Sequence, residues 1–592
     1  MLKKIISLTA VLIFSALMFS SCVLPSVTDK SGNREKNPDS EIKDGDIDPG
    51  GNPVGDAEEY VDENLKFSLI KSDAEYELSD GKAAIGDVKI PAFYKGKPVT
   101  AIGKEAFATS YETWDMTEFF ENTGLLSITI PAGVRNINRD AFNGCTSLVS
   151  VSFLDGSRLE FIDDRVFADC RSLSDISIPA GIAGIGWRAF AGCIRLEEII
   201  IPISTIAIGD EAFNSCTSLR NIKIPSGMIE IGSYAFNGCE KLAAIEIPES
   251  VTYIGEEAFH ETAWYNNQAD GLVYAGKMLY AYKGEMPPET TIDNIRSDTF
   301  AIGRSVFSMW RFDYCENLVG VSIPASVKCI ARQAFAGCTN LTTLIFLEGS
   351  KLESIEHGAF FGCAGLADIL LPESVRDIGS WAFSGTAWLN SQPDGFVYLG
   401  KALYSHKGTL PADIDNIRAD TTMISTSIKD QGSYTLRSII IPASVENIGG
   451  GLFWSCPNLV SVTFEKGSRL KSIPFQAFSK SEKLTAVNIP DGVTNIEYYA
   501  FSGCISLADV IIPAGVINIG YMAFASCPRI TSLMIPTGVA SVGSSAFSNY
   551  AGTLIIEGFS NQLEADMAWG ANWRNGISDN AVVIYAKKSF YR

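Results

Sequence analysis

Apolar residues recur along this chain in a unit of 23 residues. The unit that runs from Cys216 to Cys239 has the pattern Cys-x-x-Leu-x-x-Ile-x-Ile-Pro-x-Gly-x-x-x-Ile-Gly-x-x-Ala-Phe-x-x-Cys. Its Phe position recurs in sixteen recognisable copies between Phe107 and Phe547, and some units are lengthened to 25 residues by a short turn. A repeat of this length indicates that the chain forms a solenoid or an array of similar units.

The pattern within one unit predicts its local structure. Ile222 and Ile224 alternate with polar residues, which predicts a short strand with one buried face. Pro225 lacks an N–H group and should end the strand, and residues 232–236 should form a short helical or 3-10 turn that places Phe236 in the core. One unit cannot bury these side chains alone, so we predict a parallel β-sheet of about 17–19 stacked coils, each about 4.8 Å from the next.

The composition narrows the class of protein. The chain has 592 residues, with 47 Lys and Arg against 68 Asp and Glu, so its formal charge is −21. A nucleic-acid-binding protein would need clustered basic residues, so we expect no nucleic-acid partner. The three His residues lie far apart in the sequence, so we expect no metal site, and no motif indicates a cofactor.

The N-terminal residues have the features of an export signal. Lys3 and Lys4 precede a mostly apolar stretch, residues 5–19, which is shorter than the roughly 20 residues that a helix needs to cross a bilayer. We therefore predict a signal peptide over residues 1–21, with an uncleaved membrane anchor as the alternative. The end of this stretch, Phe-Ser-Ser-Cys, resembles the cleavage motif of bacterial lipoproteins, with Phe where Leu is usual. The resemblance implies that Cys22 is lipidated and that the protein reaches the membrane through this anchor only.

Residues 22–65 are predicted to form a flexible acidic linker. Between Asp29 and Leu65 there are 12 acidic and 4 basic residues, with few large apolar side chains. So little burial cannot offset the entropy that ordering costs, and the excess negative charge extends the chain. After the linker we expect a solenoid over residues 66–553 and a C-terminal cap over residues 554–592 that protects the last coil.

The recurring string Ile-Pro-x-Gly/Ser-Val-x-x-Ile-Gly-x-x-Ala-Phe-x-Gly-Cys resembles the leucine-rich repeats of the BspA-like branch, which is found in bacterial surface proteins. The resemblance covers roughly residues 67–586, and residues 94–103 look like that family's opening unit. It implies a leucine-rich repeat solenoid and a surface-exposed binding protein, of the kind reported as adhesins for host matrix proteins or other bacteria. The shared motif is structural, so it does not indicate the ligand.

Two similar segments interrupt the repeat. Residues 262–284 match residues 386–408, and both contain Gln-x-Asp-Gly-x-Val-Tyr-x-Gly-Lys-x-Leu-Tyr. Alternating apolar positions around the Gly-Lys turn predict β-hairpins that protrude from the solenoid. Six aromatic residues are candidate ligand contacts there: Trp264, Tyr274, Tyr280, Trp388, Tyr398 and Tyr404. We favour the alternative that they pack each hairpin onto the neighbouring coil.

Eleven cysteines share one position of the repeat: Cys145, Cys170, Cys193, Cys216, Cys239, Cys315, Cys338, Cys363, Cys456, Cys504 and Cys527. Stacking would bring neighbouring sulfur atoms within about 5 Å, inside the Cα range for disulfides. In a parallel ladder, however, the Cβ atoms of neighbours point the same way, which disfavours bridging. We therefore interpret these cysteines as a structural ladder of small, buried, free side chains, rather than as disulfides or a metal site.

The outward positions of the predicted strands are the candidate binding face. Carboxylates are scattered over these positions and are never paired within a strand, whereas glycosidase chemistry needs two at a fixed separation, so we do not expect an enzyme. The second outward position is polar in the early coils and apolar at Ile345, Leu370, Ile440, Ile511 and Met534. A row of exposed aliphatic side chains marks an interaction surface. The alternatives are that loops cover them or that β-propensity alone selects Ile.

These patterns together predict an exported, lipid-anchored protein of the bacterial cell envelope. We expect the protein to be anchored in the outer membrane and to face the cell surface. Its expected task is adhesion through the solenoid face. The ligand would be a protein or glycan, of the host extracellular matrix or of other bacterial cells. A periplasmic envelope scaffold is the alternative, and a carbohydrate-active β-helix enzyme is a distant third.

Overall fold

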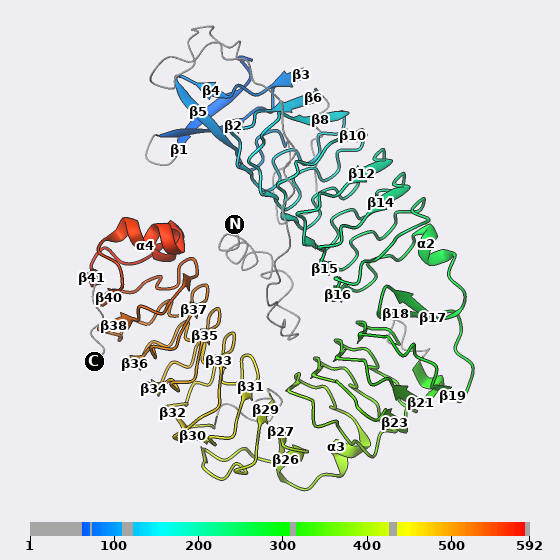
Figure 1. The fold of residues 1–592 in the computed structure, drawn as a ribbon, viewed down its shortest axis with the longest axis vertical. Coiled ribbons are helices and arrows are strands. Elements are labelled where there is room, and N and C mark those ends of the chain that lie inside the picture. The colour runs from blue at the N-terminus through cyan, green and yellow to red at the C-terminus, as the bar shows by residue number, and fades with distance from the viewer. Residues whose placement is uncertain are drawn as a thin grey trace, which may run out of the picture. The chain divides into compact units, whose positions relative to one another are not determined.

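The computed structural model describes residues 62–70, 74–108, 122, 124–307, 315–425 and 435–586. The expected signal peptide, Cys22 and the linker up to residue 61 lie outside these residues. The chain divides into two compact units between Asn267 and Gln268, which we call the N-terminal unit and the C-terminal unit and describe separately (Figure 1).

Each regular coil contributes two strands. The coil between Cys216 and Cys239 holds β14 (Asn221–Lys223), which is the strand predicted before the Pro, and also β15 (Glu230–Ile231), which ends at the Ile before the Gly. Both strands pair in parallel with the equivalent strands of the preceding coil, because Ile222 lies opposite Ile199 and Ile231 lies opposite Ile208. We call the two sets the long-strand and the short-strand sheets.

The N-terminal unit begins with a cap and continues with regular coils. In the cap, β1 (Lys66–Ile70) is antiparallel to β2 (Glu75–Asp80), and β4 (Phe93–Tyr94) is antiparallel to β5 (Lys97–Ile102), which pairs in parallel with β2. The long strands are β3 (Gly86–Lys89), β6 (Leu125–Ile130), β8 (Ser150–Phe153), β10 (Asp175–Ile176), β12 (Glu198–Ile200) and β14. The short strands are β7 (Asn136–Ile137), β9 (Phe161–Ile162), β11 (Gly184–Ile185), β13 (Ala207–Ile208), β15 and β16 (Tyr253–Ile254), followed by the helix α2 (Ala263–Asn266).

The C-terminal unit repeats this arrangement and contains two hairpins, β17 (Gly271–Ala275) with β18 (Met278–Lys283) and β26 (Gly395–Leu399) with β27 (Ala402–Lys407). Its long strands are β19 (Thr290–Ile292), β21 (Leu318–Ile323), β23 (Thr343–Phe346), β28 (Asp413–Ile414), β30 (Ser438–Ile441), β32 (Ser461–Phe464), β34 (Ala486–Asn488), β36 (Asp509–Ile511), β38 (Ser532–Ile535), β40 (Thr553–Glu557) and β41 (Val582–Ala586). Its short strands are β20 (Ala301–Ile302), β22 (Cys329–Ile330), β24 (Ser354–Ile355), β25 (Asp377–Ile378), β29 (Met423–Ile424), β31 (Asn447–Ile448), β33 (Ser472–Ile473), β35 (Asn495–Ile496), β37 (Asn518–Ile519) and β39 (Ser541–Val542).

Helix is rare in both units. The described residues contain α2, α3 (Ala387–Ser391), α4 (Gln562–Trp569) and the 3-10 turns η1 (Cys315–Asn317) and η3 (Ala571–Arg574). The prediction of a parallel solenoid is confirmed, with about 20 turns at a spacing of about 23 residues, slightly more turns than the 17–19 expected.

The repeated Phe residues form the centre of the core. In the N-terminal unit, seven buried rings stack in order from Phe107 to Phe259, with centroids 4.9–5.7 Å apart. In the C-terminal unit, one stack runs from Phe307 to Phe383 and another from Phe453 to Phe547. Each stack therefore repeats once per coil and fixes the register of the strands on both sides.

The segment before each Phe is a hydrogen-bonded turn with a left-handed residue, where a short helical turn was expected. The second residue after the Gly has a positive φ, for example 54° at Glu211 and 56° at Tyr234. Such a conformation costs a residue other than Gly roughly 1–2 kcal/mol. Hydrogen bonds between coils offset this cost, because the Tyr234 N–H donates to the carbonyl oxygen of Glu256 at 2.8 Å.

The Gly of the repeat is needed because neighbouring coils approach closely. A Cβ atom at Gly232 would lie 2.4 Å from the backbone nitrogen of Asp210, and one at Gly255 would lie 2.2 Å from that of Ser233. Such distances cannot be accommodated without moving a coil.

The C-terminal end of the last coil is covered by α4, η3 and β41. Trp573 is buried and its ring meets the last Phe of the stack, Phe547, edge-on at 6.5 Å. Trp569 packs edge-on against Trp573 at 5.6 Å. Strand β41 pairs in parallel with β40 and extends the long-strand sheet by one strand. These elements lie in the segment that the sequence assigned to a cap.

Candidate functional site

The aliphatic side chains that were expected on the long-strand face reach solvent at most positions. Leu370 is 87% exposed and Ile345, one coil earlier, is 46% exposed. Ile440 and Ile511 are also exposed, whereas Met534 is half-buried. No loop among the described residues covers Leu370, so the alternative that loops cover these aliphatic side chains is wrong at this position.

The expectation that this position is polar in the early coils is wrong at one place. Ile200, at the end of β12 in the N-terminal unit, is 80% exposed. It lies opposite Lys223 of β14, so it is an isolated aliphatic side chain beside a charged one. Exposed aliphatic side chains therefore occur in both units.

Leu370 borders a shallow hollow of about 360 Å³. Its lining includes the apolar residues Phe346, Leu347, Leu371 and Pro372 as well as Leu370. The hollow forms where the extra turn of a 25-residue unit stands beside the shorter turn of the next coil. Leu370 thus borders the hollow, whereas Ile345 lies one residue before Phe346 of its lining.

A second apolar row lies at the end of the C-terminal unit. Met534 is opposite Ile555, which is opposite the exposed Ile584 of β41. Ile511 lies one coil earlier at the same position of its strand. The row therefore continues two strands beyond Met534, into the cap, where the repeat pattern is lost and does not predict an outward position.

The aromatic residues of the hairpins pack inside their own units. In the N-terminal unit, Trp264 meets Phe259 edge-on at 5.2 Å. In the second hairpin, Trp388 and Tyr404 are buried against Phe383, and the Phe383 N–H donates to the Tyr404 hydroxyl oxygen at 2.8 Å. These contacts favour packing over ligand binding for these three side chains.

An arginine packs against the tyrosine on the first strand of each hairpin, Tyr274 in β17 and Tyr398 in β26. Tyr280, on the second strand of the first hairpin, is buried. The Arg296 guanidinium lies 4.8 Å from the centre of the Tyr274 ring, and that of Arg418 lies 4.7 Å from the Tyr398 ring. The backbone N–H groups of the same arginines donate to the two hydroxyl oxygens. These tyrosines are therefore packed as well.

The hairpins join the sheets, whereas they were expected to protrude. Strand β18 pairs in parallel with β20, with Leu279 opposite Ile302, and β27 pairs with β29, with Leu403 opposite Ile424. Leu279 and Leu403 are buried and take the place of the Ile of a short strand. The second strand of each hairpin is thus part of the stack.

The thiols of the ladder donate hydrogen bonds, which the sequence did not indicate. Eight of them donate to the carbonyl oxygen of the repeated Phe in the preceding coil, with Sγ–O distances of 3.0–3.7 Å: Cys145, Cys170, Cys193, Cys216, Cys239, Cys363, Cys504 and Cys527. Ser481, which replaces Cys in one coil, donates to Phe453 in the same way at 2.6 Å. A Ser hydroxyl can therefore take the place of the Cys thiol as donor at this position.

One pair departs from the expected ladder of free thiols. Cys315 and Cys338 form a disulfide, with their Cα atoms 4.4 Å apart. Cys315 opens the 3-10 turn η1 and lies eight residues after Phe307, whereas other ladder cysteines lie three residues after their Phe. Its Cβ direction is therefore not set by the regular turn, which removes the objection to bridging. The other ladder cysteines are buried and form no disulfide.

A surface that the sequence reading missed lies at the two residues between the Gly position of each unit and the Ala-Phe that follows. We call these residues the variable strip. They stack in register, because the N–H of the second residue donates to the carbonyl oxygen of the first residue in the next coil, as from Arg165 to Trp187 at 2.8 Å and from Arg188 to Asp210 at 2.9 Å. These two residues are the unspecified positions of the recurring Ile-Gly-x-x-Ala-Phe string, and their variation from unit to unit could have indicated an exposed surface.

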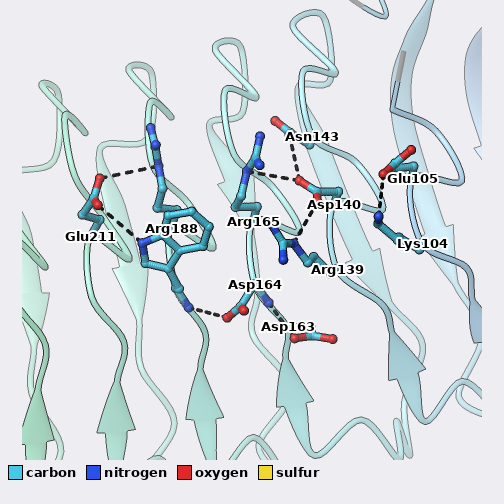
Figure 2. Close-up of polar contacts among 11 residues, drawn as sticks. Lys104, Glu105, Arg139, Asp140, Asn143, Asp163, Asp164, Arg165, Arg188 and Glu211 are labelled. Carbon is cyan, nitrogen blue, oxygen red and sulfur yellow. Dashed lines mark hydrogen bonds and ion pairs between the residues drawn. The ribbon is translucent and has the colours of Figure 1, made fainter. Parts of the chain in front are cut away.

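In the N-terminal unit, the variable strip carries a network of charged side chains that runs from Lys104 to Glu211 (Figure 2). Both Arg139 and Arg165 direct Nε at the carboxylate of Asp140, at 3.2 Å each. Glu211 lies 3.6 Å from the Arg188 Nε and accepts a hydrogen bond from the Trp187 indole at 3.4 Å. The positive charges there are matched by carboxylates.

The strip changes in character along the C-terminal unit. Its first coils carry Arg304, Arg332 and His357, with Trp381 in the following coil. Its later coils carry aromatic residues, and the rings of Phe475 and Tyr498 stack at 5.3 Å. One repeated backbone therefore presents different chemistry in different coils.

The fold and its stacked coils define a leucine-rich repeat protein. The model of the BspA type leucine rich repeat region matches residues 116–202, 160–268, 292–400 and 426–553, which is more than half of the chain. The chain therefore belongs to the BspA-type leucine-rich repeat family. Members of this family are bacterial surface proteins that bind other molecules and are typically not enzymes.

Several solved structures are similar to this chain, although distantly. A leucine-rich repeat protein from Bacteroides ovatus ATCC 8483 is 21% identical, with 89% of this chain and 100% of that chain covered and a TM-score of 0.30. The pneumococcal vaccine antigen PcpA is 18% identical, with 89% and 98% covered and a TM-score of 0.30. A leucine rich cell surface protein from Faecalibacterium prausnitzii A2-165 is 20% identical, with 90% and 98% covered and a TM-score of 0.21. No curated protein matches the chain.

Two further features bear on the site. Within the described ranges, no three His, Cys, Asp or Glu side chains come together in a way that could hold a metal ion. The helices that the structure describes are all too short or too polar to span a membrane.

Proposed function

We propose that this protein is a lipid-anchored binding protein at the bacterial cell surface, and that it adheres to a protein of the host matrix or of another bacterium. The observation that carries the proposal is the pair of exposed aliphatic side chains Leu370 and Ile345, together with a hollow beside Leu370 that is lined by apolar residues and by Ser350, Glu373 and Ser374. Solitary exposed aliphatic side chains are common on proteins, but two of them on successive coils, with a hollow beside one, are typical of an interaction site.

The energetics of these side chains favour a protein partner. Burial of apolar surface contributes roughly 25 cal/mol per Å², so covering Leu370 would contribute about 1.5–3 kcal/mol and covering the half-exposed Ile345 roughly half of that. The hollow would accept an apolar side chain of the partner between the two turns. A protein surface supplies such side chains.

The N-terminal residues support the cell-surface location. The basic residues Lys3 and Lys4, the short apolar stretch and the small residues before Cys22 are the features of an exported lipoprotein. Several acyl chains on Cys22 would give stable attachment to the membrane. The acidic residues of the linker would then hold the solenoid away from the membrane surface.

Binding of the full chain to immobilised host matrix proteins and to partner bacteria tests this function. The double variant Ile345→Ser with Leu370→Ser should bind at least about tenfold more weakly, since about 1.4 kcal/mol corresponds to a factor of ten. The matched control is Ile200→Ser, which removes an Ile about as exposed as Leu370 from the same strand position of the N-terminal unit. Equal binding by the double variant and the control would refute these two side chains as the contact surface.

A further inference from the structure

The cap at the end of the C-terminal unit has an apolar outer face. Leu563 and Met567 lie one turn apart on α4 and are 67% and 80% exposed. The buried residues of the same helix, Ala565 and Trp569, lie on its opposite side. The terminal elements of a solenoid usually present polar residues to solvent, so two large apolar side chains at this place indicate that another surface covers them.

Strand β41, which lies with α4 at this end of the unit, has an open edge (Figure 1). Among the described residues, β41 pairs with β40 alone. The Val582 N–H points to that side, because it donates to the carbonyl oxygen of Gly552 at 3.1 Å. Backbone groups alternate between the two sides of a strand, so those of Val583 and Tyr585 face away from β40.

This edge lacks the features that usually prevent the pairing of edge strands. Proteins protect an exposed edge with a charged residue, a proline or a bulge. Residues 582–586 are Val-Val-Ile-Tyr-Ala, with no charged residue and no Pro, and their pairing with β40 has no irregularity. Val582 and Ile584 also expose their side chains, at 53% and 45%. The edge can therefore accept a further strand.

We propose that the cap is an interface between two copies of this chain, in which β41 pairs in an antiparallel manner with β41 of the second copy and the two α4 helices meet through Leu563 and Met567. The strand is complementary to itself about its central residue, Ile584. With the twofold axis at Ile584, all five residues of β41 are paired, and Val583 exchanges hydrogen bonds with Tyr585 of the second copy.

A second copy accounts for both exposed surfaces in one contact. In a twofold interface each surface meets the same surface of the other copy, so the second β41 brings a second α4 with it. A strand of an unrelated protein would cover the edge of β41 and leave Leu563 and Met567 exposed. The second copy thus explains an observation that another strand does not.

The apolar row of the long-strand sheet and the charge of the chain also favour a second copy. The row described above ends at the open edge, on Ile584, and would continue into the same row of the second copy. Two chains that each carry a net charge of −21 repel each other, so they can meet only where charge is absent, and β41 carries none. Leu370 takes no part in this interface, which is therefore independent of the proposed ligand contact.

Sedimentation velocity of the purified full chain over a range of concentrations tests the proposal. We expect a monomer at low concentration and a dimer, without larger species, at high concentration, because a twofold contact closes on itself. We also expect the dimer to persist or strengthen when salt is raised, because salt screens the repulsion between the two acidic chains.

Two variants change the contact without changing the core. Ile584→Lys places like charges opposite each other across the twofold axis, and Leu563→Ser with Met567→Ser removes the apolar face of α4. Each should dimerise at least about tenfold more weakly than the parent chain. The matched control is Ile345→Ser with Leu370→Ser, which removes two exposed aliphatic side chains elsewhere in the same unit and should dimerise as the parent chain does.

Cysteine cross-linking tests the register of the two strands. Opposite residues that share no hydrogen bond have Cα atoms about 4.5 Å apart, which is within the range for a disulfide. Ile584→Cys should therefore link two chains under mild oxidation. Val582→Cys, at an exposed position of the same strand, would lie about 13 Å from its counterpart and should not. The ladder cysteines are buried, so the parent chain treated in the same way gives the background.

Circular dichroism and thermal melting would establish that the variants are folded. A parent chain that stays monomeric at every concentration would overturn the proposal and would mean that a strand of another protein, or residues of this chain beyond Ala586, cover the edge. Undiminished dimerisation of the Ile584→Lys or the α4 variant, an equal loss in the control, or equal cross-linking of Val582→Cys and Ile584→Cys would each overturn it as well.

Discussion

The thiol of Cys216 donates a hydrogen bond to the backbone carbonyl oxygen of Phe190 in the preceding coil, with 3.2 Å between Sγ and O. The same relationship links Cys239 to Phe213 at 3.2 Å. The Cys and the Phe of the repeat are therefore coupled, because each Phe carbonyl group is satisfied by the Cys of the next coil.

This coupling predicts that the ladder requires a donor. Cys216→Ala removes this bond, while the Phe190 carbonyl oxygen keeps the backbone N–H of Cys193 at 3.2 Å, so the variant should destabilise the chain by about 0.5–1.5 kcal/mol. Cys216→Ser keeps a donor, as Ser481 does in its own coil, and should cost less. Urea denaturation followed by circular dichroism measures the difference. An equal loss for both variants would show that the cysteine contributes packing alone.

The buried thiols are also predicted to be unreactive. Burial raises the pKa of Cys363 to about 12 and that of Cys527 to about 12. The thiolate is the reactive form, so at pH 8 neither residue should react with iodoacetamide in the native chain, and both should react after denaturation. Peptide mass spectrometry after labelling identifies the modified residues. Rapid labelling of Cys363 in the native chain would contradict the buried ladder.

A buried carboxyl group makes stability depend on pH. Burial, and secondarily the charge of Asp210, raises the pKa of Glu230 from 4.5 to about 8. Because the pKa is raised in the folded chain, the protonated form is favoured by folding, and stability is lost as pH rises from about 4.5 to about 8. Glu230→Gln removes this loss and should stabilise the chain at pH 9 by on the order of 3 kcal/mol.

The comparison of melting temperatures at pH 5 and pH 9 tests this prediction. The parent chain and the Glu230→Gln variant should melt at similar temperatures at pH 5, and the variant should melt higher at pH 9. A variant that melts lower than the parent at both values would mean that the charged carboxylate is stabilising.

The close approach of the coils predicts a difference between two glycines of one coil. A Cβ atom at Gly232 would lie 2.4 Å from the Asp210 backbone nitrogen, whereas one at Gly227 would lie 3.6 Å from the carbonyl oxygen of Ile203. Gly232→Ala should therefore destabilise the chain by several kcal/mol, as overpacking does, and Gly227→Ala should be close to neutral. Thermal melting of the two variants provides the test, and similar melting temperatures would contradict the close contact.

Two tryptophans of the C-terminal unit should behave oppositely. Trp388 is buried against Phe383 and Tyr404, so Trp388→Ala should cost about 3–5 kcal/mol of stability. Trp381 is exposed, so Trp381→Ala should have little effect on stability. Denaturation midpoints distinguish the two roles. A large loss from Trp381→Ala would mean that this ring has a structural role.

The stacked parallel architecture could be predicted because the same buried residue types recur at the same positions in every coil. Ile222, Ile224 and Phe236 are apolar for packing reasons alone, and their spacing determines a strand and a core position. The second strand of each coil could not be predicted, since Glu230 and Ile231 are too short a segment to show a period. The left-handed residue was missed because hydrogen bonds between coils, and not its own side chain, impose the conformation.

The candidate site was predicted only where a single side chain carried the signal. Leu370 and Ile345 could be found because an aliphatic residue at an outward position is unexpected. The variable strip could not be found in that way, because Arg304, Arg332 and His357 are ordinary residues at variable positions and come into line only when the coils are stacked in register. The disulfide between Cys315 and Cys338 depends likewise on an irregular connection.

The central claim is that the solenoid faces the outside of the cell, and protease treatment of intact cells tests it most directly. An antibody to the solenoid would follow the protein while a protease is added, with a periplasmic protein as the control for envelope integrity. The account predicts that the protein is cleaved in the acidic linker and lost from intact cells while the control survives. Survival of the protein until the envelope is permeabilised would contradict the account and would place the solenoid in the periplasm.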